Sequence, residues 1–200
     1  MNSKGRASSS GASNVMDYTD GANRLGVADL VTSIVRAAHE DPSDPRRLLT
    51  TARSQIEELL AVPNLLTLGV PRMRVHSENS WWLYFDPLIR IAVATPESEP
   101  ITHDHGTWQL FCVYNGEVDY RAYRRLDDGV VPGVAEIELE SRELLQRGSI
   151  LVIPPPPHDI HDWEPVKPET HLLAIHGPHM APLRRYFTPG QRHYVVRSPR

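Results

Sequence analysis

The feature that most constrains the fold is an abrupt change in the residue pattern of the chain at Pro63. After this residue the chain consists of short runs rich in β-branched and aromatic residues, separated by proline, glycine, aspartate and asparagine, which is typical of an antiparallel β domain. Asn115-Gly116 predicts a hairpin turn between two of the runs, because both residues tolerate positive φ. The expected strands are Met73 to His76, Trp81 to Phe85, Ile89 to Ala94, His103 to Tyr114, Glu117 to Arg125, Ala135 to Leu139, Ser149 to Ile153, Asp159 to Trp163, His171 to His176 and His193 to Val196.

The part before Pro63 has a different character. Residues 1–24 are rich in Ser, Gly, Ala and Asn and are expected to form a disordered arm. Apolar residues at helical spacing predict one helix from Leu25 to Ala38 and a second from Pro45 to Leu60. We therefore expect three parts: the arm, a helical segment over 25–62 that packs on a β barrel, and the barrel itself over 63–200.

Composition narrows the classes of partner. The net charge at pH 7 is −4 and the basic residues are scattered, so no nucleic acid partner is expected. The chain lacks an apolar run long enough to cross a membrane and an N-terminal secretion signal, and Cys112 is its one cysteine. These features favour a cytoplasmic protein without a membrane partner.

A pair of histidines carries the main chemical signal. Side chains two apart on a strand point to the same face, so His103 and His105 can both present an imidazole nitrogen to one ion. A third histidine from a distant strand would complete a site with open positions, which suits a divalent first-row metal that performs chemistry. His158 and His161 are the candidates for this third ligand.

The pattern His103-x-His105-x3-Gln109-x6-Gly116 resembles the first signature of the cupin superfamily, and Gly148-x5-Pro154 resembles the second. The resemblance covers roughly residues 100–165 and implies a mainly β fold, the cupin double-stranded β-helix or jelly-roll barrel, here with helices before it. The string from His103 to Trp108 is similar to the thiol dioxygenase branch, of the cysteine dioxygenase type. That branch implies a single Fe(II) ion, held by three histidines, which adds dioxygen to a thiol.

The same resemblance favours His161 as the third ligand, because an aliphatic residue precedes it as in the family segment. His158 instead follows four prolines, which cannot join a central β ladder. Gln109 stands where an acidic residue is usual, and strand parity places it on the face of the histidine pair, as a weak ligand or a hydrogen-bond donor beside the ligands. The family's arginine for a substrate carboxylate would fall near Arg74, which as an alternative is a solvated surface charge.

The sequence differs from the family at the positions that determine substrate specificity. His176 stands where the family has an active-site tyrosine, and the neighbouring serine and histidine are absent. Parity directs His176 into the barrel, as an acid–base or oxygen-positioning group or as a packed, hydrogen-bonded histidine. Cys112 is expected to point out of the barrel. Asp104 and Trp108 are expected to support packing.

These observations favour an Fe(II)-dependent dioxygenase that acts with dioxygen on a small molecule, a thiol being the leading substrate class. Two alternatives stay open. The first is a metal-dependent cupin of non-oxidative chemistry, such as an isomerase, hydrolase or lyase. The second is a cupin that binds a metal or ligand without turnover. The sequence does not predict the oligomeric state.

Overall fold

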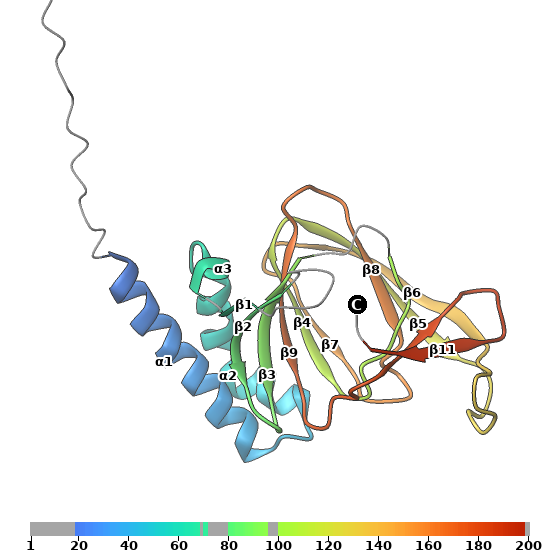
Figure 1. The fold of residues 1–200 in the computed structure, drawn as a ribbon. Helices are drawn as coiled ribbons and strands as arrows, with labels where there is room; N and C mark the ends of the chain where they lie inside the picture. Colours follow the sequence, from blue (N-terminus) through green and yellow to red (C-terminus); the bar gives the residue numbers. More distant parts are fainter. Residues whose placement is uncertain (1–18, 69, 72–79, 96–99, 199–200) are drawn as a thin grey trace, which may run out of the picture.

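The computed structural model describes residues 19–68, 70–71, 80–95 and 100–198, with side chains from Gly26 onward except at 70–71 (Figure 1). Three helices precede the strands. The elements are α1 Thr19–Glu40, α2 Pro45–Ala61, α3 Leu65–Leu68, β1 Val70–Pro71, β2 Ser80–Phe85, β3 Arg90–Ala94, β4 Gln109–Asn115, β5 Glu117–Arg125, β6 Ile137–Gln146, β7 Ile150–Ile153, β8 His161–Pro165, β9 His171–His176, β10 Arg184–Phe187 and β11 Tyr194–Arg197. The expected strand from Met73 to His76 lies outside the described residues.

The two long helices cover the ranges that the apolar spacing predicts, but α1 begins at Thr19, so residues 19–24 are helical and not part of a disordered arm as predicted. Residues 1–18 of the expected arm lie outside the described part of the chain. Asp44 caps α2, because its carboxylate accepts hydrogen bonds from the backbone N–H groups of Arg46 and Arg47, and Pro45 occupies the first helical turn. The buried face of α2 carries Leu48, Ala52, Ile56, Leu59 and Leu60. This face packs with α1 against one face of a β-sheet, so the helices cover the β domain on one side (Figure 1).

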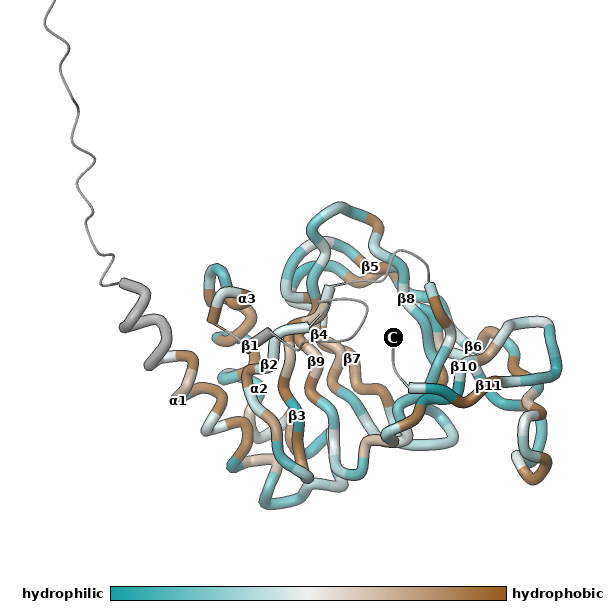
Figure 2. Tube along the Cα trace, viewed as in Figure 1, coloured by the Kyte–Doolittle hydropathy of each residue, from teal (hydrophilic) through white to brown (hydrophobic). Residues whose placement is uncertain are grey.

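The first sheet has the strand order β1-β2-β3-β9-β4-β7. Alternate residues of its strands point toward the helices, among them Cys112 on β4 and Leu173 and Ile175 on β9, and all three are fully buried there. Tyr114 fastens the layers together, since its hydroxyl donates to the carbonyl of Val62 and accepts from the N–H of Leu65. Figure 2 shows this side of the molecule as the more apolar one.

The second sheet has the order β6-β5-β8. It continues through residues 101–105, which we call the histidine segment, because His103 forms single β-bridges to His161 on one side and to Tyr186 of β10 on the other. Strand β11 pairs with β10 at the far edge.

The strand pairing defines the topology. The pairs β5 with β6, β4 with β7, the histidine segment with β8, and β3 with β9 are nested in the sequence, as in one long hairpin wound on itself. Successive pairs of this hairpin lie alternately in the second and the first sheet. Pairing of β4 with β9 joins the pairs of the first sheet, and pairing of β5 with β8 joins those of the second. This arrangement is a double-stranded β-helix, or jelly roll, and the predicted fold class is confirmed. Within the described ranges the strands form two open sheets, without a ladder that closes them into one barrel.

One turn behaves differently from the prediction. Gly116 has a positive φ of 81°, as expected, but Asn115-Gly116 does not connect a hairpin, because β4 and β5 lie in different sheets. The chain crosses from one sheet to the other here. A Cβ at Gly116 would lie 2.3 Å from the hydroxyl of Thr170, so the crossing needs glycine for space as well as for its backbone angle.

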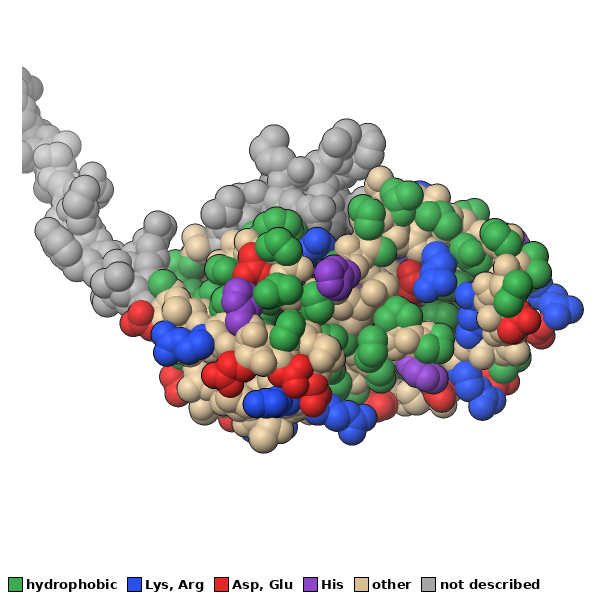
Figure 3. Space-filling model, turned by 90° about the horizontal axis from the view of Figure 1, so that it is seen from below, with side chains coloured by type: hydrophobic (Ala, Val, Ile, Leu, Met, Phe, Trp, Pro, Cys, Tyr) green, Lys and Arg blue, Asp and Glu red, His purple; other side chains and the backbone are tan. Residues whose placement is uncertain are grey.

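The remaining differences concern element boundaries. The expected strand from His103 to Tyr114 is divided: the histidine segment belongs to the second sheet and β4 to the first. β6 runs beyond the predicted end at Leu139, and β10 has no predicted counterpart. None of the helices in the described part of the chain combines the length and apolar character that crossing a bilayer requires. On the surface, acidic and basic side chains are interspersed over the face seen in Figure 3.

Candidate metal centre

The structure brings His103, His105 and His161 together between the two sheets. Each offers a ring nitrogen, and these three nitrogens lie within 4.8 Å of one another. The backbone N–H of His103 donates to the carbonyl of His161 and receives the reciprocal bond, both at 2.9 Å. A direct backbone pair therefore joins two ligands that are almost sixty residues apart in the chain.

Two of the three imidazoles have their tautomers set by the backbone. Nδ1 of His103 lies 2.7 Å from the carbonyl oxygen of Ile101, and Nδ1 of His161 lies 2.8 Å from the carbonyl oxygen of Asp159. A carbonyl oxygen only accepts hydrogen bonds, so Nδ1 must carry the proton in both rings. The lone pair is then on Nε2, the arrangement found in metal-ligating histidines.

The environment keeps the three rings neutral. Burial holds the pKa of His103 and the pKa of His105 well below the ordinary value, and the positive charge of Arg184 lowers both further. Burial also lowers the pKa of His161 to about 4, and Arg184 contributes there too. Imidazoles that are neutral at physiological pH are the form that binds a metal.

The geometry of the pair fits a shared ion. Nε2 of His103 lies 3.1 Å from Nε2 of His105, while two nitrogens that each lie about 2.1 Å from one ion, at right angles around it, are about 3.0 Å apart. Nδ1 of His105 is buried and lacks a hydrogen-bond partner among the described residues. The donor set and this spacing fit a divalent metal held by His103, His105 and His161.

Asp159 supports two of the ligands at once. Its Oδ2 accepts from the N–H of His105 at 3.2 Å and of Gly106 at 2.8 Å, while its backbone carbonyl accepts from His161. The residue is fully buried, and burial together with the negative charge of Asp104 raises the pKa of its carboxyl group to about 6. Asp104 itself points away from the site and forms an ion pair with Arg185.

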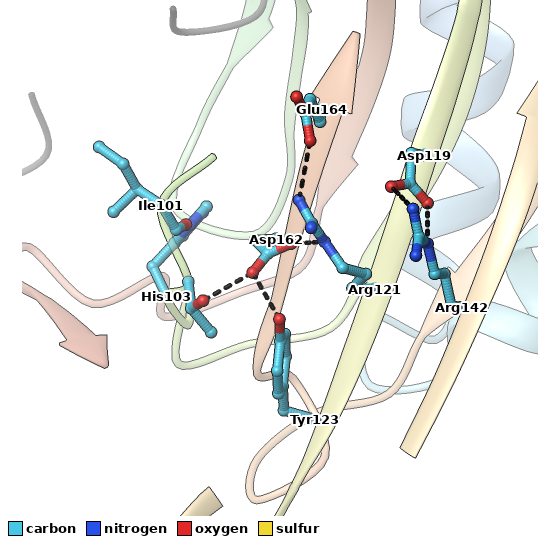
Figure 4. Close-up of polar contacts among 9 residues, drawn as sticks. Ile101, His103, Asp119, Arg121, Tyr123, Arg142, Asp162 and Glu164 are labelled. Atoms are coloured by element: carbon cyan, nitrogen blue, oxygen red, sulfur yellow. Dashed lines mark hydrogen bonds and ion pairs between the residues drawn. The ribbon is translucent and has the colours of Figure 1, made fainter. Parts of the chain in front are cut away.

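The carboxylate of Asp162 connects neighbouring strands through hydrogen bonds (Figure 4). Asp162 accepts from the Thr102 hydroxyl at 2.6 Å, from the Tyr123 hydroxyl at 2.9 Å and from Nε of Arg121 at 2.6 Å. Burial and the hydrogen bond to Asp162 raise the pKa of Tyr123 to about 12, so its hydroxyl remains a donor. The network links the histidine segment, β5 and β8, which fixes the positions of His103 and His161.

The triad lines a cavity of about 120 Å³ between the sheets. The other residues around it come from both sheets and include two arginines but no carboxylate among the described residues. They are Ser80, Trp82, Arg90, Ala92, Ala94, Thr95, Ile101, Gln109, Phe111, Trp163, Leu172, Ala174, His176, Met180, Arg184 and Tyr186.

The structure places most of the predicted site residues in this cavity. Gln109 and His176 line it, as strand parity predicts, and the ring of His176 lies 4.7 Å from that of His105. His158 is exposed and outside the cluster, so the structure brings His161 rather than His158 to the pair. Arg74 lies outside the described residues.

Sequence reasoning missed the contribution of β10. Arg184 and Tyr186 point into the cavity, whereas Arg185, between them, pairs with Asp104 on the outside. The alternation within Arg184-Arg185-Tyr186-Phe187 was the available signal. Cys112 points out of the β domain toward the helices, and Trp108 packs there too, its indole N–H donating to the carbonyl of Pro42 at 2.8 Å.

Comparisons with known proteins give likenesses of fold. No protein-family model and no curated protein matches the sequence. Among solved structures, a cupin superfamily protein from Desulfitobacterium hafniense is similar, with a TM-score of 0.36 and 16% identity over 50% of this chain and 75% of that one. An uncharacterised conserved protein with a double-stranded β-helix domain from Klebsiella pneumoniae has a TM-score of 0.38 and 15% identity over 60% of this chain and 86% of that one.

A hydroquinone 1,2-dioxygenase, solved with Cd²⁺ and 4-hydroxybenzonitrile, has a TM-score of 0.38 and 12% identity over 48% of this chain and 61% of that one. The fold assignment itself rests on the nested strand pairing described above. The resemblance to the cysteine dioxygenase type stays a prediction from the sequence.

Proposed function

We propose that this chain is a mononuclear iron dioxygenase of the thiol dioxygenase type, which adds both atoms of dioxygen to the sulfur of a small thiol. The observation that carries the proposal is the convergence of three buried, neutral imidazoles on a cavity without a carboxylate among its described lining residues. Bound Fe(II) would supply open coordination positions and the redox chemistry that dioxygen requires and that zinc lacks.

Gln109 supports a donor set of three imidazoles alone. A carboxylate at this position would cancel one charge of a bound dication, whereas the neutral amide preserves both charges for an anionic substrate. Oε1 of Gln109 is buried without a hydrogen-bond partner among the described residues, and the side chain lines the same cavity as the histidines. We assign it the role of an acceptor beside the metal.

We assign to Arg184 the binding of a substrate anion, the role that the sequence also predicts for Arg74, which lies outside the described residues. Arg184 lines the cavity beside the three histidines, so its guanidinium can hold an anionic group of a molecule bound there. Arg90 lines the same cavity. His176, beside His105, is placed to hold or move a proton on the substrate, and this role stays part of the proposal.

The direct test uses the full chain loaded with Fe(II) under anaerobic conditions, then mixed with 3-mercaptopropionate, cysteine or cysteamine in oxygenated buffer. We expect consumption of one dioxygen per thiol and a sulfinate product carrying both oxygen atoms of ¹⁸O₂, whereas the zinc-loaded chain should be inactive. Turnover by the zinc-loaded chain without oxygen would favour the non-oxidative alternative. If the iron-loaded chain consumes no oxygen with any of these three thiols, the proposal is refuted.

A variant tests the role of Arg184 separately. Arg184→Met should raise the KM for 3-mercaptopropionate, which carries a carboxylate, by about 10- to 100-fold. The KM for cysteamine, which has no carboxylate, should change little. Equal effects on the two thiols would contradict recognition of an anion by this side chain.

A further inference from the structure

The inner face of the first sheet is organised in rows, because directly opposite residues of paired strands point to the same side. Arg90, His176 and Gln109 lie opposite one another on β3, β9 and β4. All three line the cavity, and His176 lies beside the triad. This polar row therefore marks the end of the cavity beside the histidine triad.

The next row, two residues further along each strand, has a different character. Trp82, Ala92, Ala174 and Phe111 lie opposite one another in this order on β2, β3, β9 and β4, and all four line the cavity. The two alanines are neighbours in the middle, where a short side chain leaves the sheet surface low, and an aromatic side chain stands on either side. The row therefore forms a slot with a methyl floor and aromatic ends.

The opposite sheet closes the slot with a third aromatic side chain. Trp163 of β8 lines the same cavity, and its ring centroid lies 5.8 Å from that of Phe111, with the planes at 76°. The whole cavity, including its polar end, has a volume of about 120 Å³, against roughly 150 Å³ for an apolar cavity that binds benzene, so it has room for no more than one ring. The walls and the volume together fit one flat ring.

We propose that the natural ligand of this cavity carries a ring-sized apolar group, which packs on Ala92 and Ala174 between Trp82 and Phe111 while its polar end faces the row of Arg90, His176 and Gln109. The inference deepens the proposed function, on which it rests only for the reaction that follows binding. It makes an aryl-bearing anionic thiol a better substrate than a short aliphatic one. Ala92 and Ala174 are then the residues that determine specificity.

The test compares two probes that differ by the ring alone. Phenylacetate and acetate are titrated into the zinc-loaded full chain, which supports no redox turnover, and binding is followed by tryptophan fluorescence and calorimetry. Phenylacetate should bind at least about tenfold more tightly than acetate. Ala174→Leu, which fills the floor of the slot, should remove most of that advantage.

Ala61→Leu is the matched control, since it makes the same change at an exposed position of α2, and it should bind both probes like the wild type. If Ala174→Leu does not fold, as judged by circular dichroism, Ala174→Val makes a smaller change in the same direction. Equal affinity of the wild type for phenylacetate and acetate would overturn the inference. So would full retention of the phenylacetate advantage in the folded Ala174 variant.

The two proposals can fail separately. A preference for phenylacetate in a chain that oxidises no thiol would leave the slot in place and refute the proposed function. Oxidation of 3-mercaptopropionate by a chain without preference for the ring would refute the slot alone.

Discussion

Asp159 offers the sharpest test of how the metal centre is held, because one residue supports two ligands. In Asp159→Ala the N–H groups of His105 and Gly106 lose their acceptor. The His105 group is buried, and a buried N–H left without a partner costs about 1–3 kcal/mol, while the half-buried Gly106 group can turn to water. We expect the free energy of unfolding of the metal-free protein to fall by at most about 1–3 kcal/mol, because removal of the buried carboxyl group, whose pKa burial raises, offsets part of the cost.

The loss should extend to the metal, since the turn that carries His105 is no longer fixed. Removal of a group that orients metal ligands typically reduces metal affinity by about 10- to 100-fold. The assays are urea denaturation of the metal-free protein and competition for Co²⁺ against a coloured chelator. Asp159→Asn is the control, because its amide oxygen can still accept both hydrogen bonds, and it should retain most of the affinity.

A metal affinity of Asp159→Ala equal to that of the wild type would refute the argument. An equal loss in both variants would also contradict it, because the effect would then come from the negative charge rather than from the hydrogen bonds. The backbone carbonyl of residue 159 is present in every variant, so its hydrogen bond with Nδ1 of His161 should be the same in all of them.

Three further predictions concern other parts of the molecule. His103→Ala should abolish metal binding while circular dichroism shows an intact β fold, and unchanged metal content by elemental analysis would contradict this. Gly177→Ala should destabilise the protein by about 1–3 kcal/mol, because the new Cβ would lie 2.3 Å from the Trp108 ring, whereas Gly26→Ala, with open space around it, should be neutral or stabilising in thermal melts. Hydrogen bonds from the Arg125 guanidinium and two backbone N–H groups lower the pKa of Asp127 to about 2, so its contribution to stability is complete above about pH 4 and is lost as the pH falls through 2. Asp127→Asn should therefore lower the free energy of unfolding by about 1–2 kcal/mol at pH 7, and by progressively less below pH 4, in urea titrations. A difference between variant and wild type that does not depend on pH would contradict this prediction.

Strand parity explains why much of the site could be predicted from the sequence. The alternation of faces is a property of the single strand, so the position of His176 in the cavity follows without knowledge of neighbouring strands. Gln109 and Cys112 lie on the predicted sides, but their prediction counted along a strand from His103 that the structure divides between two sheets. Helix spacing and the Asp44-Pro45 start are local in the same sense.

The parts that escaped prediction depend on partners far apart in the chain. Asn115-Gly116 specifies a turn, but nothing in the two residues says that the strands on either side join different sheets. The contribution of Arg184 arises because β10 pairs with the histidine segment about eighty residues earlier, and no local pattern encodes that contact. The row of alanines between aromatics likewise exists only once four strands are in register.

The position of the histidine segment between β8 and β10 affects when the centre can form during synthesis. His103 and His105 emerge from the ribosome well before His161, and the strand that covers their other edge follows later still. The early pair lacks its third ligand until His161 has been made, and the histidine segment lacks one of its two backbone partners until β10 is complete at Phe187. We therefore expect metal uptake to be a late event in the maturation of this protein, after the β domain has closed around the segment.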